Sequence, residues 1–213
     1  MNLKIISLFG IIAPIIFVIT VVVGGLITSG YSHLSQSISE LVMSGAQNKL
    51  YLDIPFSINY VFSCIFGFGL FVIFQSKASP LNSSTGLIGF TILGIIAILS
   101  FLSSNIFTMN LPGTPATTSG TIHLILVGLE SIGSMVAILL VGLWFKKVGL
   151  SGYSVYSIIT LIIVFITGIM TVVRTTQDSS YVGLFERLTI GAFVLWSFVI
   201  ALKFYNFTPS LQA

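Results

Sequence analysis

The polar side chains that could carry chemistry begin with a cluster in one short stretch, residues 31–41. There His33, Ser37 and Glu40 are spaced so that they share one face of a helix. The opposite face holds the apolar side of the stretch: Tyr31, Leu34, Ile38 and Leu41. The pattern predicts a short amphipathic helix that lies at a membrane surface with its apolar face down. Because Ser37 and Glu40 also fit a capping box, a helix that begins inside the stretch is the alternative.

A histidine, a hydroxyl and a carboxylate are the residue types of nucleophilic catalysis. On one short helix, however, His33, Ser37 and Glu40 all point the same way and do not align as a Ser–His–acid relay. A relay that also draws on His123 and Glu130, further along the chain, is the other arrangement. The candidate catalytic residues are therefore His33, Glu40, His123 and Glu130, and the sequence leaves open whether the protein is an enzyme.

Two histidines with one of these glutamates could in principle ligate a metal ion. The chain has no His-Glu-x-x-His motif or other close ligand spacing. Its single cysteine, Cys64, excludes an intrachain disulfide and cysteine-rich zinc sites. A bis-histidine haem normally needs ligands on facing helices, and His33 lies in a connection. We therefore predict no metal site and no other cofactor.

Glu130 is the most informative single position, because it lies inside an apolar segment. An ionised carboxylate within a membrane helix costs about 2.5–3.5 kcal/mol on insertion scales, so it must be paired, hydrated or protonated. Arg187 and Arg174 are its predicted partners. One interpretation is an ion pair that ties helices together, and the other is a group that contacts a ligand or handles a proton.

Ser37, Arg174, Glu186 and Arg187 complete the predicted site as ligand-binding residues. A guanidinium group suits a lipid phosphate, and the plainer interpretation is a charge or ion pair at head-group depth. Glu186 and Arg187 are adjacent in the sequence and point about 100° apart on a helix, so we expect each to contact a different neighbour.

The elements that must position these residues are membrane helices. The chain has 213 residues, of which 55% are hydrophobic and 6% are charged, whereas soluble domains carry roughly a quarter charged residues. A chain this apolar belongs in a bilayer, and membrane lipids are its expected partners. The net charge of +3 is scattered without a basic run, so nucleic acid is not expected. The composition does not indicate an oligomeric state.

Six apolar segments reach the roughly 20 residues that cross a bilayer. With no repeat and no long linker, they predict an all-α polytopic membrane protein, one bundle over residues 1–213. The predicted spans are residues 5–27, 56–74, 86–107, 120–145, 153–173 and 183–204. Pro14 predicts a kink in the first span. In the third span, small residues predict close packing against a neighbour: Gly86, Gly89, Gly94, Ser100, Ser103 and Ser104.

The distribution of basic residues predicts the orientation. Six spans place both termini on one side of the membrane, together with Lys4, Lys77, Lys146, Lys147 and Lys203. The other side holds Lys49, Arg174 and Arg187, and the two arginines have acids nearby, Asp178 and Glu186. The lysine excess predicts cytoplasmic termini in a plasma-membrane protein. Nearly all the unusual polar residues then lie on the extracytoplasmic side.

The run Tyr31-Ser-His-Leu-Ser-Gln-Ser-Ile-Ser-Glu-Leu41 after a first span resembles the signature of the family called "domain of unknown function 998". Two further motifs match, Gly120-Thr-Ile-His123 and Gly-Leu-Phe-Glu-Arg over residues 183–187. The resemblance implies a six-span bacterial or archaeal membrane protein and no particular activity. Where the family commonly has an acidic residue after the third span, this chain has Phe107-Thr-Met-Asn110.

A weaker, architectural similarity is to eukaryotic six-span proteins of the autophagy-modulator (DRAM) type, some of whose relatives act in lipid remodelling. The sequence thus supports two functions. The first is a membrane protein whose extracytoplasmic polar pocket binds or processes a lipid or lipid-linked head group. The alternative is a non-catalytic structural, accessory or small transport protein whose buried charges form helix–helix ion pairs. Transport is the weaker form of it, since the chain shows no paired broken helices and no internal repeat.

Overall fold

The computed structural model describes residues 2–75, 82–111, 113–177 and 180–206. The described part is all-helical, as predicted, and its six long helices are each long and apolar enough to cross a membrane. They are α1 (Leu3–Ile27), α2 (Lys49–Phe74), α3 (Ser84–Asn105), α4 (Thr118–Lys147), α5 (Ser151–Thr176) and α6 (Val182–Tyr205). The chain is therefore a multi-pass membrane protein.

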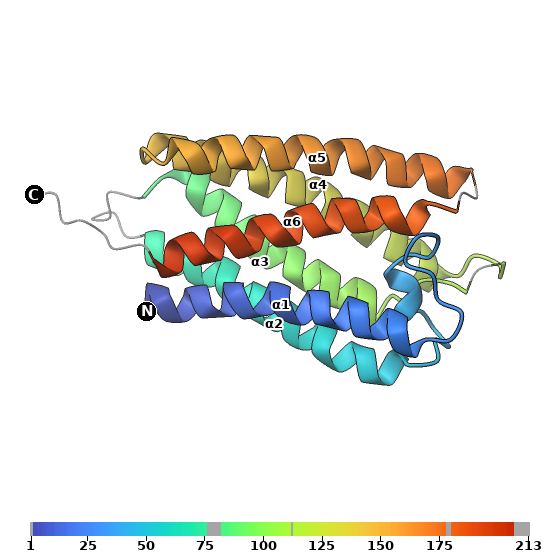
Figure 1. Ribbon diagram of the computed structural model, residues 1–213. Helices are drawn as coiled ribbons and strands as arrows, with labels where there is room; N and C mark the ends of the chain where they lie inside the picture. The colour runs from blue at the N-terminus through green and yellow to red at the C-terminus, as the bar shows by residue number, and fades with distance from the viewer. Residues whose placement is uncertain (1, 76–81, 112, 178–179, 207–213) are drawn as a thin grey trace, which may run out of the picture.

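The six helices close into a ring. Each packs against its neighbours in the sequence, and α6 returns to pack against α1. α1 begins and α6 finishes at the same end of the bundle, which we call the terminal end (Figure 1). The connection between α1 and α2 covers the opposite end, which we call the loop end (Figure 1).

Five of the six predicted spans agree with the observed helices to within three residues at either end. The exception is α2, which begins at Lys49, well before the predicted start at residue 56. The predicted span starts just after Pro55, but the helix continues through that residue. Lys49 and Asp53 support this first part of α2, because they form an ion pair of 2.8 Å one turn apart. Pro14 likewise lies inside the continuous helix α1.

Large aromatic side chains fill the terminal end of the ring. Phe74, Phe90, Trp144, Phe145 and Phe204 are almost fully buried and pack with one another. The ring centroids of Phe90 and Trp144 are 5.4 Å apart, and those of Phe74 and Phe204 are 5.6 Å apart. This aromatic cluster leaves the terminal end of the ring closed.

Glycines let the helices of this half approach closely, as the small residues of the third span predicted. A Cβ atom added to Gly86 would lie 2.5 Å from Cδ1 of Trp144, and one on Gly89 would lie 2.8 Å from Cγ2 of Val141. A Cβ atom on Gly67 of α2 would collide with the backbone of Gly94 on α3. The α2–α3 and α3–α4 boundaries therefore have no room for a larger side chain at these points.

The predicted surface helix over residues 31–41 is wrong in its extent. Only Ser39–Leu41 form a short 3₁₀ helix, η1, and the residues before it form turns. The alternative of a capping box is confirmed. The Ser37 amide donates to Oε1 of Glu40 at 2.8 Å, and the Glu40 amide donates to Oγ of Ser37 at 3.3 Å.

Most of the apolar side chains of this segment enter the ring instead of lying on a membrane surface, whereas Leu34 stays exposed. Ile38, Leu41 and Val42 are buried against Val21 of α1 and Phe56 of α2. The reason is physical: the mouth of a helical ring offers these side chains closer packing than a lipid interface does. Residues 31–42 thus form a plug in the loop end.

Candidate functional site

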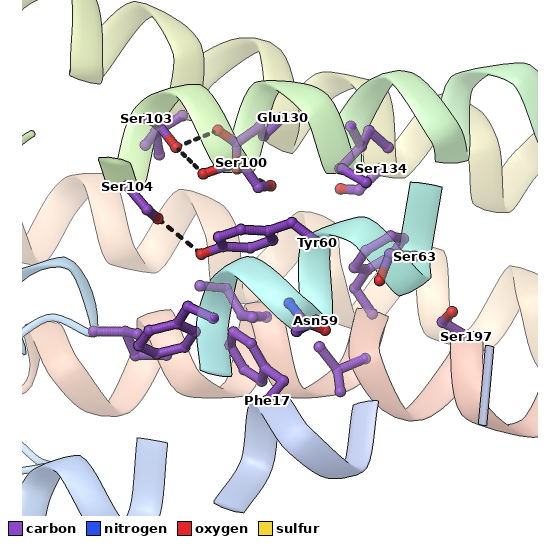
Figure 2. A pocket seen from close by; sticks show the side chains of 18 of the residues that line it. Phe17, Asn59, Tyr60, Ser63, Ser100, Ser103, Ser104, Glu130, Ser134 and Ser197 are labelled. Atoms are coloured by element: carbon purple, nitrogen blue, oxygen red, sulfur yellow. Dashed lines mark hydrogen bonds between the residues drawn. The ribbon is translucent and has the colours of Figure 1, made fainter. Parts of the chain in front are cut away.

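A cavity of about 200 Å³ lies inside the ring beneath the plug. Among the described residues, every long helix except α5 contributes to its walls, and the plug closes it with Ile38, Ser39 and Val42. The walls combine apolar side chains with eight serines and two carboxyl groups, those of Glu130 and Glu186. Figure 2 shows part of this lining from close by.

Glu130 of α4 is held by two serine hydroxyls from α3. Ser100 Oγ donates to its Oε2 atom at 2.7 Å, and Ser103 Oγ lies 2.9 Å from its Oε1 atom (Figure 2). The predicted ion pair of Glu130 with Arg187 or Arg174 is wrong. Among the described residues, the ion pair between Lys49 and Asp53 is the only one within 4.0 Å. The two serines lie one turn apart on the neighbouring helix, so neutral donors satisfy both carboxyl oxygens directly.

The same end of α3 also bonds to α2. The hydroxyl groups of Tyr60 and Ser104 are 2.8 Å apart, and Ser57 Oγ donates to Oδ1 of Asn105 at 3.2 Å (Figure 2 shows the first). The last turns of α3 therefore connect α2 on one side to Glu130 on the other. The small size of the α3 serines predicted close packing alone, and this hydrogen-bonding role was not predicted.

His123 fixes the position of that end of α3. It is buried, and its Nδ1 atom lies 3.0 Å from the carbonyl oxygens of both Ser103 and Phe107. Because both partners are acceptors, Nδ1 carries the ring proton. His123 does not line the cavity, so it reaches Glu130 only through Ser103. The hydrogen bonds of its Nδ1 atom therefore hold the end of α3 and do not reach a group of the cavity directly.

The start of α6 binds the plug through adjacent side chains. Glu186 accepts a hydrogen bond of 2.6 Å from the Ile38 amide, and Arg187 donates to the Gln36 carbonyl at 2.7 Å and to the Tyr31 hydroxyl. We call these contacts the latch. The expectation that Glu186 and Arg187 contact different neighbours is confirmed. Of the two, only Glu186 lines the cavity.

Glycine makes the latch possible at residue 183. A Cβ atom there would lie 2.8 Å from the His33 carbonyl oxygen and would also collide with Gln36. The Leu184 amide, next in the chain, donates to the Leu34 carbonyl at 2.9 Å. Two of the motifs noted in the sequence, residues 31–41 and 183–187, are therefore in direct contact.

Arg187 is the cation of the latch, and two neutral aromatic side chains, Tyr31 and His33, lie near it. Burial raises the pKa of Tyr31 to about 12, although the Arg187 guanidinium acts in the opposite direction. Its hydroxyl therefore remains protonated and donates to the Ser37 carbonyl at 2.7 Å. Partial burial, and then Arg187, lower the pKa of His33, so a second positive charge is disfavoured there.

The remaining predicted residues do not meet at the cavity. Glu40 accepts hydrogen bonds from Ser37 and Gln36 within its own loop. Arg174 lies 6.0 Å from the centre of the Phe185 ring, outside the cavity lining. Asp178, the acid expected near Arg174, lies outside the described residues. Within the described chain, no three His, Cys, Asp or Glu side chains are grouped so that they could hold a metal ion.

Other polar residues that line the cavity were not among the predicted site residues, among them Asn59, Tyr60, Ser63, Ser134 and Ser197. Figure 2 places them around the space that Glu130 faces. A signal was present in the sequence, since polar residues three or four apart inside an apolar span mark one face of a helix. Asn59 and Ser63 have this spacing in α2, and Ser100, Ser103 and Ser104 have it in α3.

The family model described as "Protein of unknown function (DUF998)" matches residues 11–203. No curated protein and no solved structure matches the chain.

Replacing Arg187 tests the latch. Arg187→Gln removes the hydrogen bonds to Gln36 and Tyr31, so we expect faster amide hydrogen exchange in residues 31–42 by about tenfold, the effect of losing one charge-assisted hydrogen bond. Exchange in α3 should stay unchanged. Lys147→Gln, a matched loss of one charge at the terminal end, is the control. Equal exchange of residues 31–42 in both variants would contradict the latch.

Proposed function

The chain belongs to the DUF998 family of proteins of unknown function, and we propose that this multi-pass membrane protein binds the polar head group of a lipid or lipid-linked molecule in the cavity. One observation carries the proposal. Glu130 lies in the wall of a cavity within an apolar bundle, and two serine hydroxyls orient its carboxyl group. Ionisable residues placed in this way inside membrane proteins are commonly functional.

The lining selects the chemistry of the head group. It offers two carboxyl groups, many hydroxyl groups and an amide, and no lysine, arginine or histidine among the described lining residues. A phosphate beside Glu130 would meet a second negative charge in a medium of low dielectric constant. Both terminal nitrogens of Arg187 donate to groups of the latch and of α6. We therefore propose a head group that donates hydrogen bonds, an alcohol or an amine.

The size of the cavity favours a small head group. A volume of about 200 Å³ is below the roughly 300–1,000 Å³ of sites that enclose drug-sized ligands. It exceeds by far the ~10–15 Å³ that one water molecule needs. A head group of a few polar atoms fits these limits, with the hydrocarbon part of the ligand outside the cavity.

The alternative, a purely structural bundle, has less support. It requires buried charges that pair between helices, and Glu130 has no cationic partner among the described residues. A bundle selected for packing alone would also gain stability by filling the cavity. The proposal is one of binding, because among the described residues no histidine side chain hydrogen-bonds a serine hydroxyl in a catalytic relay.

We further propose that the protein lies in the plasma membrane with its loop end outside. Four described lysines lie in helices at the terminal end: Lys4, Lys146, Lys147 and Lys203. Lys77, the fifth lysine expected on that side, is outside the described residues. At the loop end, the charge of Lys49 is paired with Asp53. Only Arg174 and Arg187 are therefore counted there when the basic residues at the two ends are compared.

Cysteine labelling in intact cells tests this orientation. In a Cys64→Ser background, Leu34→Cys places a thiol at an exposed loop-end position, and Ser151→Cys places one at the terminal end. We expect a membrane-impermeant maleimide to label the first variant in intact cells and the second only after permeabilisation. The reverse pattern would contradict the proposed orientation.

Competition for a photoreactive lipid tests the head-group chemistry. With a hexadecanol that carries its diazirine beside the hydroxyl group as the probe in lipid nanodiscs, hexadecanol and hexadecylamine should compete for labelling of the cavity, and hexadecyl phosphate should not. Glu130→Gln should weaken probe binding about tenfold or more, as expected for a lost hydrogen bond to a charged or strongly polar group. Asp53→Asn, a matched change outside the cavity, should bind normally. Competition by hexadecyl phosphate alone would overturn the proposed chemistry.

A further inference from the structure

An apolar crevice lies on the outside of the ring between α1 and α6. Its volume is about 290 Å³, and all of its lining residues are apolar or glycine. They come from the middle of both helices, between residues 14 and 19 of α1 and between residues 191 and 198 of α6. The outer surface of these membrane helices faces lipid, so the crevice opens toward hydrocarbon chains.

The crevice and the cavity share a wall. Pro14 of α1 and Val194 of α6 line both spaces. The crevice owes part of its depth to Gly191, since a Cβ atom added there would have no heavy atom within 4 Å. The cavity and the crevice are therefore adjacent at Pro14 and Val194.

Both ends of the cavity and two of its side boundaries are closed. At the loop end, Ile38, Leu41 and Val42 of the plug are buried, and the latch holds the plug to α6. The aromatic cluster fills the terminal end. The α2–α3 boundary has the close approach of Gly67 to Gly94, and hydrogen bonds of Glu130 cross the α3–α4 boundary.

We propose that the crevice binds the hydrocarbon chain of the same molecule whose head group occupies the cavity, and that this molecule enters from the bilayer between α1 and α6. The inference rests on the proposed function. A lipid whose head group lies beside Glu130 must keep its chain in an apolar environment, because exposing a chain to water is costly. The crevice provides that environment directly across the wall made by Pro14 and Val194.

Two exposed glycines provide a matched test. Gly191→Leu fills the crevice without touching a polar residue of the cavity. Gly128→Leu makes the same change on α4, where a Cβ atom also has open space and the residue lines neither the cavity nor the crevice. Leu195→Trp is a second filling variant, from an exposed position in the crevice. Melting temperatures show which variants remain folded.

The probe is a hexadecanol with a diazirine at the end of its chain, incorporated into nanodiscs with the full-length protein. In the wild type we expect crosslinks to residues of the crevice on α1 and α6. Both filling variants should lower this labelling about tenfold, since extra bulk in a filled site costs binding energy, and Gly128→Leu should not. Glu130→Gln should lower it as well, because head group and chain belong to one bound molecule.

Three results would overturn the inference in distinguishable ways. The first result is that folded Gly191→Leu and Leu195→Trp still show competition at the cavity and label the crevice as the wild type does. The proposed chain site and entry route would then be wrong, while head-group binding in the cavity would stand. If Glu130→Gln leaves crevice labelling unchanged, the crevice holds an ordinary lipid of the bilayer. If unlabelled hexadecanol fails to compete in the wild type, the proposed function fails too.

Discussion

The structure depends on satisfying one carboxyl group, that of Glu130, within an apolar bundle. Ser100 and Ser103 supply a hydrogen-bond partner to each of its two oxygens. Those serines must then be held in place, which His123 does through the Ser103 carbonyl. Tyr60 holds the same end of α3 from the opposite side through Ser104. One polar requirement thereby sets how α2, α3 and α4 are arranged around a space.

The two ends of the ring enclose the cavity, and each end is closed in a different way. Aromatic side chains fill the terminal end, and the plug with its latch covers the loop end. The loop end is closed by a connecting segment held by hydrogen bonds, and the terminal end is closed by side chains of the helices. The loop end is therefore the more easily rearranged of the two ends. The side of the ring at α1 and α6, where Gly191 thins the wall, faces lipid directly. A site of this form suits a ligand that is polar at one end and apolar at the other.

The sequence predicts the six helices well, because uninterrupted apolar runs leave few other folds. It also singles out Glu130, and the spacing of Ser37 and Glu40 identifies their capping box. The partner of Glu130 was beyond its reach, since choosing between an arginine and a serine requires the rotation of each helix about its axis. Serine is both a small packing residue and a hydrogen-bond donor, so Ser100 and Ser103 were assigned to packing. The apolar side chains of residues 31–41 suit a membrane surface or a ring mouth equally, and only packing decides between them.

Native mass spectrometry of the protein purified with its own lipids tests the central claim most directly. Wild type would be compared with Glu130→Gln and Asp53→Asn, and the melting temperature of each would be recorded. We predict that wild type and Asp53→Asn retain one amphiphile with an alcohol or amine head group, and that folded Glu130→Gln has lost it. Equal retention by all three proteins, or a lowered melting temperature of Glu130→Gln with no retained molecule in any of them, would contradict the claim and make the carboxyl group a structural element.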